Sequence, residues 1–298
     1  MLARVSFTPE TSLMAEYFSF QAALCFSIAH VLVRRGLVHS NALTGSFVSL
    51  AISATAFWML LPWFAPVSAL WAPGIGYFIA AGLFAPAIGQ TLGYLGIERI
   101  GVARSMPIVN SAPIFSSLLA VLFLGEVWVL QNMIGTALVI IGAIILSSSR
   151  PAEGQWRKLD IIYPILGALA FGISTTLRKT GLTEVQIPIL GAAVATGTAF
   201  FVLLGIIQTQ GGRQALDLNR RSGGWLLGAA MVNTGAILSV FSALNVGTVV
   251  RVEPLIACNP LLSLLWTGLF LKKLERLSAR IVVGALVTVT GTVLVATA

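Results

Sequence analysis

Hydrophobic positions along this chain gather into long runs that short polar connectors separate. A helix of about 20 residues crosses the hydrocarbon core of a bilayer. Ten runs come close to this length, at residues 13–33, 42–63, 74–95, 102–124, 129–146, 161–177, 187–207, 225–244, 248–271 and 279–296. The pattern predicts an all-α integral membrane protein with ten transmembrane helices.

Composition agrees with this prediction. The chain is 57% hydrophobic and 9% charged, whereas soluble domains carry about 25% charged residues. The longest connectors, 147–160 and 208–220, are too short and too polar to form soluble domains. The activity of the protein is therefore expected inside the membrane.

The net charge of +8 does not indicate a nucleic-acid partner. The 18 basic residues are scattered through short connectors without interleaved exposed aromatic residues, so we expect them to contact anionic lipid. The two cysteines, Cys25 and Cys258, fall inside predicted helices and form no disulfide framework.

The second half of the chain repeats the first. Residues 25–37 align with 170–182 at an offset of 145, and 103–113 align with 250–260 at an offset of 147. At an offset of 149, the glycine pair Gly135 and Gly142 meets the pair Gly284 and Gly291. Offsets that change this slowly indicate a duplication with small insertions.

Each repeat holds five predicted helices, covering 13–146 and 161–296 with a linker at 147–160. Because five is odd, the second repeat must enter the membrane in the opposite sense from the first. The sequence thus predicts two inverted five-helix repeats, an arrangement that many secondary transporters share. Two inverted copies can exchange conformations, which is the requirement of alternating access.

Residues 113–146 resemble the closing part of an EamA-type repeat of the drug/metabolite transporter superfamily, with FLGE at 123–126. Residues 259–295 are a looser copy, with FLKKLE where FLGE is expected. The resemblance covers nearly the whole chain. It implies ten spans, inverted repeats and the export or exchange of small metabolites.

Prolines interrupt the fourth and ninth predicted helices at equivalent places. Pro113 and Pro260 each remove an amide donor inside a span, and such a break should face protein or a wet cavity. Asn110 and Asn259 lie beside these breaks. We expect them to line a central solute site, or alternatively to bridge neighbouring helices.

A second proline pair, Pro107 and Pro254, is typical of the first turn of a helix. Arg104 and Arg251 would then lie just outside helix starts, at opposite mouths of an inverted pair. They are candidates for gating or for attracting an anion, and headgroup anchoring is the alternative. The candidate partners of the two arginines are Glu98 and Glu253.

No acidic residue falls near the centre of a predicted span, and the ionisable candidates there reduce to His30, Glu16 and Glu253. Proton-coupled carriers usually bury such a group along the pathway. A proton-independent facilitator or exchanger therefore stays open, and His30 is either a solute ligand or a packing residue.

Further polar positions are expected to line the solute cavity. Gln90 and Tyr94 share one helix face, and Asn233 and Ser239 belong to the eighth predicted span. Lipid-facing positions should be apolar, so these side chains are expected to point inward.

Motifs of catalysis, cofactor binding and metal binding are absent from the sequence, and we predict no enzyme, no cofactor and no metal site. The leading hypothesis is a secondary transporter of a small polar metabolite, acting as exporter, exchanger or facilitator in the cell membrane. The alternative is a non-transporting membrane scaffold or sensor.

Two signals disagree on orientation. By connector, 14 basic residues fall on the side opposite the termini and 4 on the side of the termini. The positive-inside rule then predicts termini outside the cell. The family resemblance implies cytoplasmic termini.

Overall fold

The computed structural model describes residues 9–36, 39–89, 92, 108–147, 157–217, 219–259, 261–262, 266 and 279–298. Within these residues the secondary structure is helical, and no strand occurs. The all-α expectation is confirmed for this part of the chain.

Each predicted apolar run overlaps one helix. The helices are α1 (Pro9–Gly36), α2 (Ala42–Phe64), α3 (Gly74–Gly82), α6 (Ala112–Leu119), α7 (Leu130–Ser147), α8 (Ile162–Glu184), α9 (Pro188–Thr209), α10 (Arg220–Val246), α11 (Val249–Ile256) and α13 (Ala279–Ala296). Two π-helical turns, η3 (Leu83–Gly89) and η4 (Ala120–Leu124), extend α3 and α6. Short 3-10 turns are η2 (Val67–Trp71), η5 (Lys158–Ile161) and η6 (Gly212–Ala215).

Among the residues that the structure describes, five helical segments are each long and apolar enough to cross a membrane. They are Ser12–Val33, Leu43–Phe64, Leu159–Glu184, Pro188–Thr209 and Arg220–Val246. Shorter apolar helices are Gly74–Gly89, Ala112–Leu124, Leu130–Ile145 and Val282–Ala296. The chain is therefore a multi-pass membrane protein.

Local sequence fixes several helix ends. Asn41 caps α2 by accepting a hydrogen bond from the Thr44 amide at 2.8 Å, as short polar side chains do at helix starts. Pro188 begins α9, where a missing amide donor is harmless. Gly125 ends η4 in the left-handed region, at φ 67°, which suits glycine.

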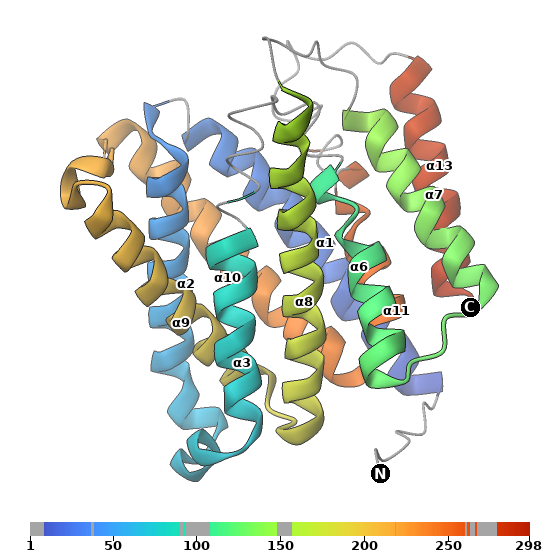
Figure 1. The fold of residues 1–298 in the computed structure, drawn as a ribbon, viewed down its shortest axis with the longest axis horizontal. Coiled ribbons are helices and arrows are strands. Elements are labelled where there is room, and N and C mark those ends of the chain that lie inside the picture. The colour runs from blue at the N-terminus through green and yellow to red at the C-terminus, as the bar shows by residue number, and fades with distance from the viewer. Residues whose placement is uncertain are drawn as a thin grey trace.

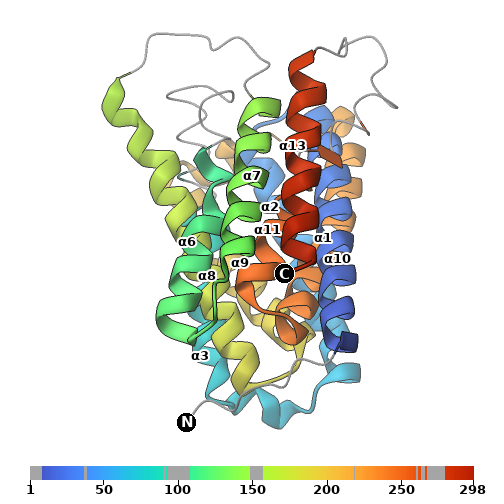
Figure 2. The ribbon, with the colours of Figure 1, turned by 90° about the vertical axis from the view of Figure 1, so that its right-hand side faces the viewer.

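The contacts between the halves come in matched pairs. Under the repeat alignment, the α1–α10 contact corresponds to α3–α8, the α2–α10 contact to α3–α9, and the α1–α11 contact to α6–α8. The contacts α2–α9, α7–α13 and α6–α11 join each helix to its own counterpart. Figure 1 shows α7 and α13 side by side at one edge, and Figure 2 shows the same pair from the side.

The predicted breaks also occur at equivalent places. The chain turns at residues 110–111 and at residues 257–258, an offset of 147. Pro113, however, lies in the first turn of α6 just after the break. A proline there removes no hydrogen bond, because the first helical amides have no partner inside the helix.

Pro254 differs from its prediction as an early-helix residue. It lies inside α11, which ends two residues later at Ile256. The start of α11 is fixed instead by Val249 and Val250, whose amides bind the Glu126 carboxylate.

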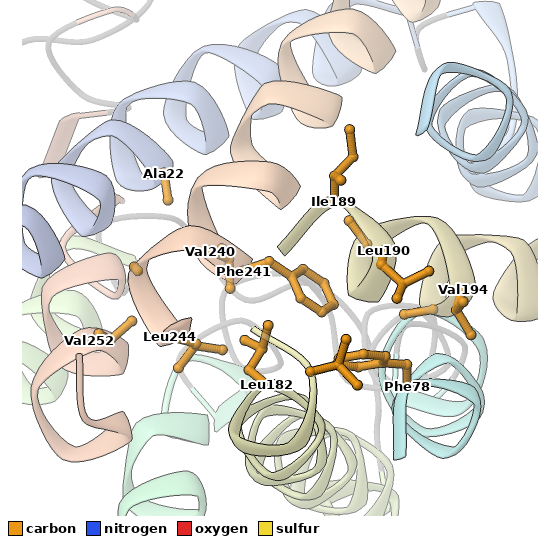
Figure 3. Packing of buried hydrophobic residues seen from close by; sticks show 14 of the residues in the cluster. Ala22, Phe78, Leu182, Ile189, Leu190, Val194, Val240, Phe241, Leu244 and Val252 are labelled. Atoms are coloured by element: carbon orange, nitrogen blue, oxygen red, sulfur yellow. The ribbon is translucent and has the colours of Figure 1, made fainter. Parts of the chain in front are cut away.

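The hydrophobic core fills the region between α3, α8, α9 and α10. Phe78 and Phe241 meet edge to face with ring centroids 6.0 Å apart, and Leu182 and Leu190 pack around them (Figure 3). Both aromatic rings are fully buried. This packing closes the bundle near the connectors 65–73 and 185–187, hereafter the termini side, which lies lowest in Figure 1.

Candidate functional site

The junction between α10 and α11 on the termini side binds two charged side chains. Only residues 247–248 separate the two helices, so the last carbonyls of α10 and the first amides of α11 lie close together. Such groups lack partners within their helices. Two charged side chains from other parts of the chain bind them.

Glu126 binds the amide end of the junction. It lies in the connector between η4 and α7, and its two oxygens accept hydrogen bonds from the Val249 amide at 2.9 Å and the Val250 amide at 3.0 Å. Burial raises the pKa of the Glu126 carboxyl, and these amides together with Lys179 oppose the rise. A carboxylate at this position also complements the positive end of the helix dipole. A residue of the first half thus holds a helix of the second half.

Lys179 binds the carbonyl end. Its Nζ donates to the Leu244 carbonyl and to the Gly247 carbonyl, both at 2.7 Å, and the side chain is buried. Lys179 and Glu126 also attract each other electrostatically. The two residues together hold the junction, and we call this pair with its backbone partners the junction clamp.

A second group of charged and polar side chains lies between α8 and α11. The Thr175 hydroxyl on α8 donates to Oε1 of Glu253 on α11 at 3.0 Å. Arg178, one turn further along α8, interacts electrostatically with Glu253, and its guanidinium lies 5.3 Å from the Phe241 ring centroid. We call Thr175, Arg178 and Glu253 the buried charge cluster.

Sequence reasoning placed Glu253 near a span end and considered it a partner of Arg251. The structure separates them. Arg251 extends toward α1, where it donates to the Ser12 hydroxyl and lies 3.9 Å from Glu16, and it also donates to the Ala296 carbonyl at 3.1 Å. Successive residues of a helix point to different faces, so Glu253 instead meets α8.

The charge count changes with the observed helix ends. The predicted sixth span ended at Leu177, whereas α8 continues to Glu184 and encloses Arg178 and Lys179. Arg251 lies inside α11 as well. Three of the four basic residues assigned to connectors on the termini side therefore lie within helices, which leaves Arg4 outside the described residues. Five basic residues counted on the opposite side, Arg34, Arg35, Arg220, Arg221 and Arg280, lie within helices as well, so both connector counts fall.

The polar residues of α10 contact α2. Asn233 Nδ2 donates to the Ser49 hydroxyl at 3.0 Å, and the Thr234 and Ser53 hydroxyls are 2.8 Å apart. Ser239 is buried and donates to the Gly235 carbonyl of its own helix. Asn233 thus connects helices of the two halves.

Replacing Asn233 with alanine is expected to lower the free energy of unfolding by about 1 kcal/mol, because one interhelical hydrogen bond is lost. Solute affinity should stay unchanged if bridging is its main role. Unfolding in mixed micelles and a binding titration of the same preparation measure the two effects. A variant of normal stability that fails to bind solute would assign Asn233 to the solute site.

The remaining predicted residues are placed as follows. Asn259 Nδ2 donates to the Ile256 carbonyl at 3.2 Å, and Asn110 lies half-buried in the turn before α6. His30 is exposed on α1, and its ring stacks on Phe26 with centroids 6.2 Å apart. Gln90, Tyr94, Arg104, Pro107 and Pro260 lie outside the described residues.

Two cavities lie near opposite ends of α1. One of about 220 Å³ adjoins the junction clamp and is lined by Ser12, Asn132, Thr248 and Arg251 among others. The other, of about 190 Å³, is lined mainly by apolar side chains with Arg35, whose guanidinium lies 5.0 Å from the Trp225 ring centroid. Ser12 and Leu32, one from each lining, are about 30 Å apart along the helix axis.

Sequence reasoning missed Glu126, Thr175, Arg178 and Lys179 as site residues. The length of α8 could have been predicted from the sequence, because the repeat alignment continues through Gly181 and Leu182, beyond Arg178 and Lys179. A span that runs through Gly181 must contain Arg178 and Lys179. Glu126 is the last residue of the FLGE motif at 123–126, but the motif does not reveal its partner, which lies on a helix more than 120 residues away.

A helical bundle with several membrane-length helices, matched contacts between its halves and buried charges defines a polytopic membrane protein of the transporter type. The model of the EamA-like transporter family matches residues 13–148 and 158–297. The chain belongs to this family, as its resemblance implied. The family is one of transporters and not of enzymes.

One solved crystal structure is similar over 94% of this chain and 95% of its own chain, with a TM-score of 0.76 and 13% identity. Its title reads only "Crystal structure of protein", and the likeness concerns the fold. Comparison with curated proteins finds no match.

Proposed function

We propose that this protein is a secondary transporter of a small polar metabolite in the cell membrane. It crosses the membrane ten times as two inverted five-helix repeats, 13–146 and 161–296, and works by alternating access. It acts as an exporter, an exchanger or a facilitator.

The matched helix contacts between the halves carry this proposal. The contacts α1–α10, α2–α10 and α1–α11 have counterparts under the repeat alignment, and α2–α9, α6–α11 and α7–α13 join each helix to its own equivalent. Two related halves in such an arrangement can exchange conformations at similar free energy, so that access moves from one membrane face to the other.

The closed termini side supports the same mechanism. Glu126 of the first half binds α11 of the second, and Phe78 of α3 packs on Phe241 of α10. Opening that side requires both contacts between halves to change. The junction clamp and the Phe78–Phe241 pair therefore act as a gate in this proposal.

Solute counterflow in proteoliposomes tests the function. Purified protein is reconstituted with an unlabelled solute inside, and uptake of the labelled solute is followed for amino acids, nucleosides, amines and organic anions. We expect transient accumulation of at least one solute, and none in liposomes without protein. Absence of counterflow across the panel, with folded protein in the bilayer, would favour a scaffold or sensor.

A further inference from the structure

The buried charge cluster contains a cation with unused hydrogen-bond donors, which a purely structural role does not require. Arg178 offers five N–H donors, and its Nε is inaccessible to solvent without a hydrogen-bond partner among the described residues. Its neighbour Lys179, by contrast, donates to two carbonyls. Arg178 therefore retains capacity to bind a further acceptor.

The location of the buried charge cluster suits a solute site. Arg178 and Glu253 are half-buried, whereas the Phe78 and Phe241 rings on the termini side of the bundle are fully buried. Phe241 provides a face on which the guanidinium rests. Arg178 thus lies directly beside the Phe241 ring of the proposed gate.

Charge balance limits what Arg178 can bind. An unpaired charge in a low-dielectric interior is costly, so the guanidinium keeps one negative partner. If an anionic solute replaces Glu253 beside Arg178, the Glu253 carboxylate is left without a counter-ion. Taking up one proton from solution makes Glu253 neutral, and the total charge of the site is unchanged.

We propose that Arg178 binds the anionic group of the solute, a carboxylate or a phosphate, and that Glu253 takes up one proton when the anion binds. The inference deepens the proposed function and depends on it for its role in transport. In the resting state Glu253 is ionised and is the negative charge that balances Arg178 within the cluster. In the loaded state the solute anion is paired with Arg178, and protonated Glu253 remains beside Thr175.

Thr175 can serve both states. Its hydroxyl donates to the Glu253 carboxylate in this structure. A hydroxyl can also accept, so it can receive a hydrogen bond from a protonated Glu253 after rotation. The carboxyl group then has a partner at every stage.

Other charged groups near α11 are already engaged elsewhere. Glu126 from the connector and Lys179 from α8 form the junction clamp, and Glu16 from α1 lies beside Arg251. Cys258, in the turn after α11, is buried. From α6, α7, α10 and α13, no titratable side chain among the described residues interacts with Glu253. Arg178 is the cation that acts on it.

Anion binding measured against pH tests the proposal. Purified wild-type protein is titrated with acetate, lactate, succinate and ethyl phosphate, and with acetamide and lactamide as neutral counterparts. For at least one anion, we expect affinity to rise by about tenfold per unit fall in pH, because one proton accompanies each anion. The carboxylates and the phosphate ester distinguish the two anion classes.

Variants separate the anion-binding role of Arg178 from the proton-accepting role of Glu253. Glu253→Gln resembles the protonated state and should bind the same anion at all pH values, without pH dependence. Arg178→Gln should lose at least tenfold in affinity, and the double variant, which leaves no buried charge unpaired, should lose it equally. Glu184→Gln, an exposed carboxylate at the end of the same helix, should behave as wild type.

The outcomes also distinguish a failure of the proposed anion site from a failure of the proposed transport function. Failure of every anion to bind, or unchanged pH dependence in Glu253→Gln, overturns the inference. Counterflow of a neutral or cationic solute that survives in the double variant also overturns it and leaves the transporter intact. Anion binding with the expected pH pattern but no counterflow would support the site and contradict transport.

Discussion

Replacing Lys179 with methionine is expected to lower the free energy of unfolding by about 3 to 5 kcal/mol, because two charge-assisted hydrogen bonds to backbone carbonyls are lost. Lys179 Nζ donates to the Leu244 and Gly247 carbonyls and attracts Glu126. Methionine has a similar length but no donor. The carbonyls at the end of α10 then lose a partner, and the Glu126 carboxylate loses its cation.

The unfolding midpoint in mixed micelles of increasing denaturing detergent measures this loss. Arg213→Met serves as the control, because Arg213 is exposed in η6 and should change stability by less than about 0.5 kcal/mol. The double variant Lys179→Met with Glu126→Gln should be less destabilised than the sum of its single variants, since no charge stays unpaired. Additive losses would contradict electrostatic coupling within the junction clamp.

Replacing Gly291 with valine is expected to cost about 1 to 3 kcal/mol or more, because it overpacks the contact between α7 and α13. A Cβ atom at Gly291 would lie 2.6 Å from the Gly135 carbonyl oxygen and 2.7 Å from the Val139 amide nitrogen. Both are backbone atoms of α7, which cannot move aside singly. The two helices would have to separate along the glycine-lined contact that small residues permit in membranes.

The same unfolding assay measures this effect. Gly205→Ala in α9 is the matched control, because a Cβ there meets nothing within 4 Å. It should be neutral or stabilise the protein by up to about 1 kcal/mol through helix propensity. If Gly291→Val and Gly205→Ala behaved alike, close backbone approach would not hold α7 and α13 together.

The predicted glycine contact illustrates what the repeat pattern could reveal. The alignment matches Gly135 with Gly284 and Gly142 with Gly291, whereas in the structure Gly135 lies against Gly291 and Gly142 against Gly284. The repeat pattern thus identified the four glycines, and only the packing of α7 on α13 decided which of them meet. The paired turns at 110–111 and 257–258 follow the repeat offset of 147.

The candidate site was predictable only in part. Asn233 was expected to point inward, and it does meet a helix of the other half, but its partner Ser49 gives it a bridging contact. Glu253 was noted for charge and assigned the wrong neighbour. A side chain on a helix is placed by its angular position, and a two-residue difference reverses the face on which it lies.

The sequence alone determined that the chain is all-helical, lies in a membrane and consists of two related halves, because bilayer thickness and helix geometry fix the length and composition of each span. Only the tertiary structure decided which charges are buried. Arg178 and Lys179 resembled connector residues, and they lie inside α8 because carbonyls and carboxylates from α10, α11 and the connector before α7 reach them. Such partners come from distant segments, and only packing brings them together.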